Sequence, residues 1–255
     1  MQPDASAKLF SAMKNLRTII LGAIVACAAA GASAADKPSA VKPTSVRPDM
    51  DKIKSEVLNP SGRYYYPKLM ANYEKNDTLM TLEDYRHLYL GTVFQEDYNP
   101  YRRSPFDNEI EQLYYKQSHT RAELDNIIEY AEQALLDDPF DLQQITFLIY
   151  ALQNRGKVNR AKIWQYRLNH LLEAILSTGT GLDAENAWIV IDPKHEYNIL
   201  NFKNNIVEEA DYVAPHYDYI KVHADASDSK ATQGYYFNIR YIIEEYYRKH
   251  PEQQE

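Results

Sequence analysis

The chain has 255 residues, which is enough for one large domain or two small ones. It carries 28 Lys and Arg against 36 Asp and Glu, and this acidic balance argues against non-specific binding of nucleic acid. Apolar residues make up 45% of the chain, which predicts a buried core rather than disorder. A single Cys excludes a disulfide framework and a multi-cysteine metal site, and tyrosine is unusually frequent, with 22 Tyr against 7 Phe.

The N-terminal residues 1–34 have the pattern of a secretory signal peptide. Lys14 and Arg17 precede an apolar run over residues 19–30, and residues 32–34 (ASA) follow as a small-residue cleavage site. The apolar run is too short for a bilayer span, which needs about 20 residues. We therefore expect export, with cleavage after residue 34.

A lipid anchor is the alternative to plain export. Residues 24–27 (IVAC) resemble a bacterial lipobox, in which the cysteine becomes the lipidated N-terminus. The alanine-rich residues after Cys27 end in the cleavage site, which favours plain export instead. The sequence thus predicts a periplasmic or secreted protein, whose only membrane contact would be a lipid at Cys27. Met13 is a second candidate for the first residue.

The chain then predicts a linker followed by helices. Residues 35–60 are rich in proline, which disfavours helix and sheet, although a short helix over residues 49–58 is expected within them. Residues 61–178 read as a helical region. In it, Thr81 with Asp84 resembles a capping box, and apolar residues follow at helical spacing.

The clearest helices lie between residues 120 and 175. Thr120 and Glu123 form a capping box, and one apolar stripe follows until Pro139 ends the helix. Asp141 is placed to cap a second helix, and a third helix follows it. These short connections predict helical hairpins.

In residues 179–250 the sequence pattern changes from helical spacing to short runs typical of strands. Residues 188–191 (WIVI), 217–222 and 234–239 read as strands, and a helix over residues 240–250 closes the chain. The connections are too short for parallel crossovers, so we expect a small antiparallel sheet. The predicted fold class is α+β and mainly α, with helical hairpins in the N-terminal two-thirds and a small α+β region after them.

The segment over residues 120–175 resembles tetratricopeptide repeats. Apolar positions recur 34 residues apart, from Ile127 to Ala161 and from Ala134 to Leu168, which is the period of that repeat. The segment holds about one and a half degenerate repeats. An ordinary helical bundle with similar spacing is the alternative.

A second resemblance covers most of the chain after the linker. Its motifs occur in the order of residues 66–69 (YPKL), 77–91 (DTLMTLEDYRHLYLG), 98–101 (YNPY), 179–181 (GTG), 196–200 (EYNIL) and 234–238 (GYYFN). This order resembles an uncharacterised family of exported bacterial proteins, known as domain of unknown function 4919. The resemblance implies an envelope protein with a helical front and a small α+β tail. It implies no activity and no catalytic residue.

Motifs for catalysis, metals and cofactors are missing from the sequence. His195-Glu196 lacks the second His of an HExxH zinc site and reads as surface residues of a short helix. His216 and His223 flank Asp218, but on one extended strand the two histidines face opposite sides. No phosphate-binding loop, dinucleotide fingerprint or nucleophile elbow is present. The sequence therefore predicts no metal and no cofactor.

The most promising binding residues lie within residues 83–105, where a helix leads into a polar, aromatic loop. Loops on rigid elements often carry binding residues, and Tyr and Arg are enriched at binding hot spots. The candidates are Asp84, Arg86, His87, Tyr89, Glu96, Tyr98, Asn99, Tyr101 and Arg102. In the structural alternative, Tyr89 fills the core, Asp84 caps the helix and Arg102 is solvated.

Three hypotheses of function follow. The first is a non-enzymatic cell-envelope protein that presents a Tyr/Arg surface to another envelope protein or to a peptide. The second is a hydrolase or metal-dependent enzyme on envelope polymers, whose acids and bases would come from Asp84, His87, Glu96 and Asp97. The third is a module that binds glycans or peptides through exposed Tyr. Nucleic acid is not an expected partner.

Overall fold

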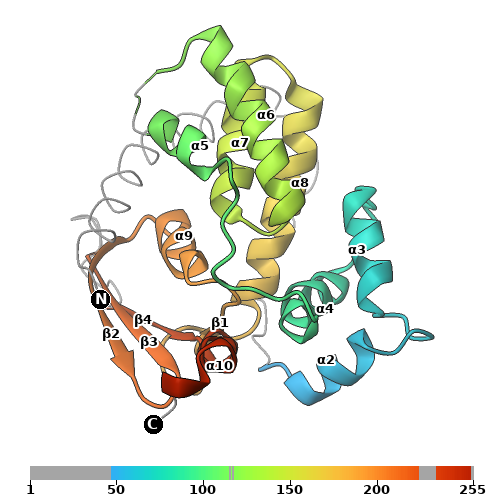
Figure 1. The fold of residues 1–255 in the computed structure, drawn as a ribbon, viewed down its shortest axis with the longest axis vertical. Coiled ribbons are helices and arrows are strands. Elements are labelled where there is room, and N and C mark those ends of the chain that lie inside the picture. The colour runs from blue at the N-terminus through green and yellow to red at the C-terminus, as the bar shows by residue number, and fades with distance from the viewer. Residues whose placement is uncertain (1–46, 115, 117, 224–233, 254–255) are drawn as a thin grey trace, which may run out of the picture. The chain divides into compact units, whose positions relative to one another are not determined.

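Figure 1 shows the fold in a computed structural model, which describes residues 47–114, 116, 118–223 and 234–253. Within these residues the chain forms two compact units. The first contains Arg103–Leu168, and the second combines Pro43–Arg102 with Asn169–Glu255. Helix α8 (Val158–Leu176) begins in the first unit and ends in the second. The predicted boundary at residue 178 stays a prediction.

The helices of the first unit begin at the caps that the sequence predicts. α6 (Arg121–Asp137) starts at a capping box: Thr120 Oγ1 accepts from the Glu123 N–H, and the Glu123 carboxylate accepts from the Thr120 N–H. α7 (Leu142–Asn154) starts at Asp141, whose carboxylate accepts from two backbone N–H groups. Both predicted caps are confirmed.

α6 packs against α7 and against α5 (Asp107–Tyr114), and Figure 1 shows α6 and α7 side by side. Arg155 Nε donates to Asp125 Oδ1 at 2.7 Å, which ties the end of this hairpin. The rings of Tyr114 and Phe147 meet edge to face at 4.6 Å in its core. The helical hairpin is thus present, and its relation to tetratricopeptide repeats stays a prediction.

In the second unit, α2 (Met50–Val57) packs against α4 (Leu82–Gly91). Asp49 caps α2 by accepting from the Lys52 N–H at 3.0 Å, and Ile53 and Val57 of α2 are buried. The short helix expected within the proline-rich segment is confirmed.

α3 (Tyr66–Glu74) also packs against α4, and the sequence did not predict it. Pro67 lies in its first turn, where a missing N–H costs no hydrogen bond. Only Leu69 and Tyr73, four residues apart, are buried on its inner face. Two apolar contacts are too few for a periodic pattern, and tertiary packing supplies the rest.

The sheet of the second unit has four strands in the order β1-β4-β3-β2. The strands are β1 (Trp188–Ile189), β2 (Ile206–Val213), β3 (Tyr217–His223) and β4 (Gly234–Asn238). Antiparallel pairing joins β3 to β4, as expected, and also joins β2 to β3, but β1 pairs parallel with β4. The expectation of a purely antiparallel sheet is therefore corrected to a mixed one. The parallel partner of β1 is the last strand, so the connection is long enough for a crossover.

β2 was not predicted, because its middle reads as polar and charged. It carries Glu208, Glu209 and Asp211 on a strand that is exposed over most of its length. As the edge strand of the described sheet, it needs little apolar character, and charge on an edge discourages pairing with other chains. Lys221 Nζ of β3 pairs with Glu209 Oε2 at 2.6 Å.

Three further elements complete the second unit: α9 (Lys194–Phe202), α10 (Arg240–Lys249) and the short 3-10 helix η2 (Pro251–Gln253). Another 3-10 turn, η1 (Thr92–Phe94), follows α4. Helices dominate, and the small sheet and closing helix follow them, so the predicted α+β, mainly α, fold class is confirmed.

Several predictions lie outside the described residues. They are the signal peptide over residues 1–34, the lipobox at Cys27, the linker up to residue 46 and the turn over residues 224–233. Among the helices that the structure describes, none combines the length and apolar character of a membrane span.

Candidate functional site

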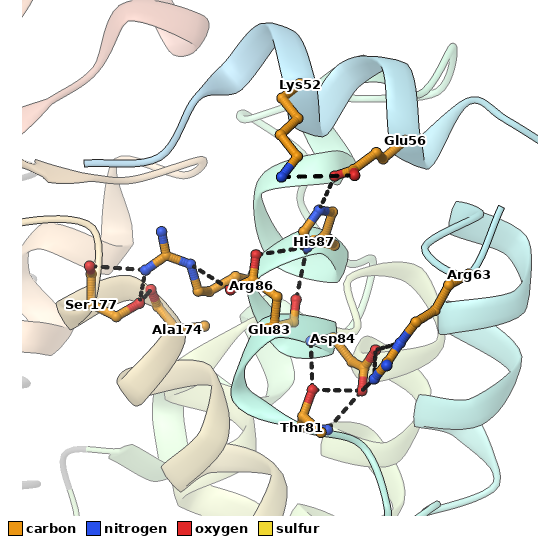
Figure 2. Close-up of polar contacts among 10 residues, drawn as sticks. All are labelled: Lys52, Glu56, Arg63, Thr81, Glu83, Asp84, Arg86, His87, Ala174 and Ser177. Carbon is orange, nitrogen blue, oxygen red and sulfur yellow. Dashed lines mark hydrogen bonds and ion pairs between the residues drawn. The ribbon is translucent and has the colours of Figure 1, made fainter. Parts of the chain in front are cut away.

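Asp84 is the first of the candidate residues along α4, and it serves as a helix cap. Its Oδ2 accepts from the Thr81 N–H at 2.8 Å, while Thr81 Oγ1 accepts from the Asp84 N–H at 3.2 Å (Figure 2). Arg63 Nη2 donates to the same carboxylate at 3.2 Å. Burial opposes ionisation, but the bonds from Thr81 and Arg63 outweigh it and lower the pKa of Asp84. The structural alternative is confirmed for this residue.

Arg86 and His87 are buried within the second unit, and both bind groups of the protein itself. Arg86 Nη1 donates to the carbonyl oxygen of Ser177 at 2.9 Å and lies 2.7 Å from its hydroxyl oxygen (Figure 2). His87 is 2% exposed, and its two ring nitrogens contact oxygens of Glu83 and Glu56. Neither side chain is presented to a partner.

Tyr89 is also part of the interior. Its hydroxyl oxygen accepts from the Ile191 N–H at 3.3 Å and lies 2.7 Å from His195 Nδ1. The ring is fully buried, so Tyr89 fills the core as the structural alternative predicts.

The remaining candidates lie on residues 95–102, which we call the 95–102 loop. Tyr98 is buried, and its hydroxyl donates to the carbonyl oxygen of Ile191 at 2.8 Å. Asn99 Oδ1 accepts from the Tyr101 N–H at 3.2 Å, and Arg102 Nη2 donates to the carbonyl oxygen of Asp97 at 2.7 Å. Local bonds and one buried tyrosine therefore fix the loop.

Two candidates of the loop face outward. Glu96 is exposed, and Tyr101 is 50% exposed, with its ring edge to face with Tyr246 of α10 at 6.3 Å. Burial is the main cause that raises the pKa of Tyr101, followed by the nearby Tyr246 and by the carboxyls of Asp192 and Asp218. Tyr101 thus lies at the surface, close to an acidic group of residues.

That acidic group is built around a carboxyl pair that the sequence did not predict. Glu196 of α9 and Asp218 of β3 share a side-chain hydrogen bond. Burial raises the pKa of Glu196 well above its usual value, and the charges of Asp218 and Asp192 raise it further. Burial also raises the pKa of Asp218, against the bond that Glu196 donates. These shifts favour the protonated form of Glu196, which is the member of the pair that donates.

The prediction that His195 and Glu196 lie on the surface is wrong, since they are 2% and 3% exposed. The spacing of apolar residues along the helix could have predicted the burial of Glu196. Ile199 and Leu200, both buried, lie three and four residues after Glu196 and therefore share its face of α9.

The chemistry available in the second unit is limited. A proton-sharing carboxyl pair can act as a general acid, but Glu196 is buried and only Asp218 is partly accessible. Asp84 and His87, two of the four acids and bases of the enzyme hypothesis, bind separate partners. Across the described ranges, His, Cys, Asp and Glu side chains do not gather in threes that could hold a metal ion.

Comparison with known proteins places the chain in a family. No curated protein matches it, and no solved structure does. One family model matches, described as domain of unknown function (DUF4919), and it covers residues 51–248. The match runs from α2 to α10, which includes α4, the 95–102 loop and the carboxyl pair. The chain therefore belongs to the DUF4919 family.

Proposed function

We propose that this chain is an exported, non-enzymatic envelope protein that binds another envelope protein or a peptide through the 95–102 loop. Tyr101 carries the proposal, because it is half exposed on a loop that Tyr98 anchors from within. A tyrosine offers apolar area and a polar tip at the same time, which suits recognition. A loop that is already ordered loses less entropy when it binds.

Burial removes five of the nine candidate residues from this surface. Asp84, Arg86, His87, Tyr89 and Tyr98 bind groups inside the protein. The recognition surface is thus narrowed to Glu96, Asn99, Tyr101 and Arg102, with Tyr246 beside Tyr101.

Export is the other part of the proposal, and it rests on the pattern of residues 1–34. Fractionation of cells that express the full chain should find it outside the cytoplasm and shortened by the signal peptide. If the protein is exported without a lipid anchor, a Cys27→Ser variant should fractionate like the parent. If Cys27 is lipidated, the variant should lose its membrane attachment. A full-length, cytoplasmic product would contradict export.

Photo-crosslinking tests the binding surface directly. A photoreactive phenylalanine analogue at Tyr101 should give one discrete crosslinked product in cells. The same analogue at Tyr212 of β2 is the matched control, since Tyr212 is 59% exposed and lies on an edge strand. Substitution of Arg102 by Ala should then weaken the crosslink at Tyr101.

Two results would remove this proposal. One is the same set of products at Tyr101 and Tyr212, which would indicate collision rather than recognition. The other is the absence of a crosslinked product at Tyr101 together with full function of the Tyr101→Ala variant. That function is measured by whether the variant reverses the phenotype of a gene deletion.

A hydrolase is the second candidate, and the Glu196–Asp218 pair is the observation that favours it. In this case Asp218 would meet the substrate, because it is the more exposed of the two acids. Envelope polymers incubated with the purified protein should be cleaved, and Asp218→Asn should abolish cleavage while Glu208→Gln, on the exposed edge strand, should not. Equal activity of the two variants would exclude this role.

A further inference from the structure

His87 of α4 contacts two oxygen atoms, one through each ring nitrogen. Nδ1 lies 2.8 Å from the backbone carbonyl oxygen of Glu83, one helical turn earlier. Nε2 lies 2.8 Å from Glu56 Oε2, which belongs to α2 (Figure 2). The ring is 2% exposed, so protein atoms rather than bulk water surround it.

The proton count at these contacts is fixed by the types of atom. A backbone carbonyl oxygen only accepts hydrogen bonds, so Nδ1 of His87 must carry a hydrogen. A neutral imidazole has only that one N–H, which would leave a lone pair on Nε2 facing the Glu56 carboxylate. A 2.8 Å contact between two acceptors is repulsive. One additional proton must therefore lie between His87 and Glu56.

The groups around the ring favour that proton. From α4, Glu83 Oε1 lies 3.4 Å from Nδ1, so a second carboxylate is directed at the imidazole. Two cations bind the outer oxygens of these carboxylates: Lys52 Nζ at 4.0 Å from Glu56, and Arg86 Nε at 3.4 Å from Glu83. Because both carboxylates lie between the cations and the ring, the charge nearest to His87 is negative.

An aromatic ring covers the imidazole face. Tyr64 stacks on His87 with ring centroids 3.7 Å apart and planes 9° apart. The guanidinium of Arg63 lies 5.3 Å from the Tyr64 ring, so it reaches the imidazole only through that ring. Stacking on Tyr stabilises a cationic partner more than a neutral one.

We propose that His87 is a proton-dependent clamp, in which an imidazolium joins α2 and Tyr64 to α4. Loss of the proton would leave the Nε2 lone pair against Glu56 and loosen α2. The proton can leave on the Glu56 side, where the side chain is 32% exposed. The apolar contacts of α2, such as Val57 against Gly91, do not depend on pH and hold the rest of the unit together. This inference does not rest on the proposed function.

Direct observation of the ring needs no substitution. In the full chain labelled with ¹⁵N-histidine, both nitrogens of His87 should show the shifts of an imidazolium at pH 7.5, where free histidine is mostly neutral. A neutral ring with one protonated nitrogen at pH 7.5 would overturn the proposal.

The Glu56→Gln variant tests the link to α2. Its amide can donate to a neutral Nε2, so the same bond forms without the extra proton, and His87 should become neutral at pH 7.5. Glu244→Gln in α10 is the control, because Glu244 is an exposed glutamate that pairs with Arg240, one helical turn earlier. That variant should keep the imidazolium.

Hydrogen exchange of the α2 amides gives the functional readout. After correction for intrinsic exchange, the opening constant of α2 should rise with pH in the parent, by up to tenfold per pH unit for one proton. It should be flat in Glu56→Gln, and the α10 amides should not differ between the two proteins. Equal pH slopes for α2 in both proteins would overturn the clamp.

Discussion

α4 and the 95–102 loop that follows it carry the same kinds of residue, yet they have opposite roles. In α4, Arg86 and Tyr89 are buried and bind Ser177 and His195. In the loop, Arg102 donates to the backbone carbonyl oxygen of Asp97, five residues earlier, and Tyr101 is half exposed. Residue type therefore did not distinguish a structural Arg or Tyr from one that is available to a partner.

The difference arises from what surrounds each segment. α4 receives α2 and α3 on its sides, so its polar side chains are desolvated and need internal partners. The loop is held by one buried residue, Tyr98, and its other side chains can remain in water. Matched substitutions should therefore lower the stability of the fold when they are made in α4, and weaken the binding of a partner when they are made in the loop.

The largest contrast is expected between the two arginines. Arg86→Leu removes the donor to the Ser177 carbonyl in a buried environment, so the free energy of unfolding should fall by about 3 kcal/mol. Arg102→Leu should change it by less than about 0.5 kcal/mol, as for most surface substitutions. Urea unfolding of both variants measures this. Equal losses would show that the loop is as deeply integrated as α4.

The tyrosines should repeat the contrast at a smaller scale. Tyr89→Phe removes a hydroxyl that accepts from Ile191 and contacts His195, so we expect a loss of about 2 kcal/mol. Tyr101→Phe removes a hydroxyl at the surface and should leave the unfolding free energy nearly unchanged. If Tyr101→Phe were the more damaging change, the loop rather than α4 would hold the unit together.

The carboxyl pair near the loop should make stability depend on pH. Burial, with Asp218 and Asp192, raises the pKa of Glu196, so the folded protein keeps a proton that the unfolded chain loses above about pH 4.3. Stability should then fall as pH rises, by at most about 1.4 kcal/mol per pH unit, until the folded-state pKa is passed.

Glu196→Gln isolates this effect, because its amide can still donate to Asp218 but has no proton to lose. The stability of the variant relative to the parent should increase as the pH rises from 5, until the folded-state pKa of Glu196 is passed, in denaturant titrations. Both proteins retain His87, so its contribution cancels in the comparison. Parallel curves would show that Glu196 is not protonated in the fold.

Tyr98→Phe should lower the free energy of unfolding by about 1 kcal/mol, less than Arg86→Leu or Tyr89→Phe, since it removes one neutral hydrogen bond to Ile191. Its effect on the loop should be clearer, with faster amide exchange at Tyr101 and a weaker photo-crosslink. A variant that exchanges faster but crosslinks as well as the parent would show that the anchored loop is not what the partner recognises.

Local signals in the sequence predicted much of the fold. The capping boxes at Thr81 and Thr120 and the cap at Asp141 set the starts of three helices. These motifs involve residues two or three apart, so their hydrogen bonds form wherever the helix forms. β2 and α3 escaped prediction, because an exposed edge strand and a helix with two buried residues carry little periodicity.

The candidate site also combines features that the sequence predicted with features that it did not. The sequence alone indicated the polar loop that follows α4, the family motifs and the cap at Asp84. Only the tertiary structure decided that His87 meets Glu56 across 31 residues, and that Glu196 meets Asp218. The spacing of residues along one helix or strand is local, so it can be recognised in the sequence. Burial and charge pairing depend on which segments, distant in the sequence, pack together in the fold. The tyrosines illustrate this difference. Their excess is visible in the sequence, but only the tertiary structure shows that Tyr85 and Tyr89 lie in the core and that Tyr101 lies at the surface.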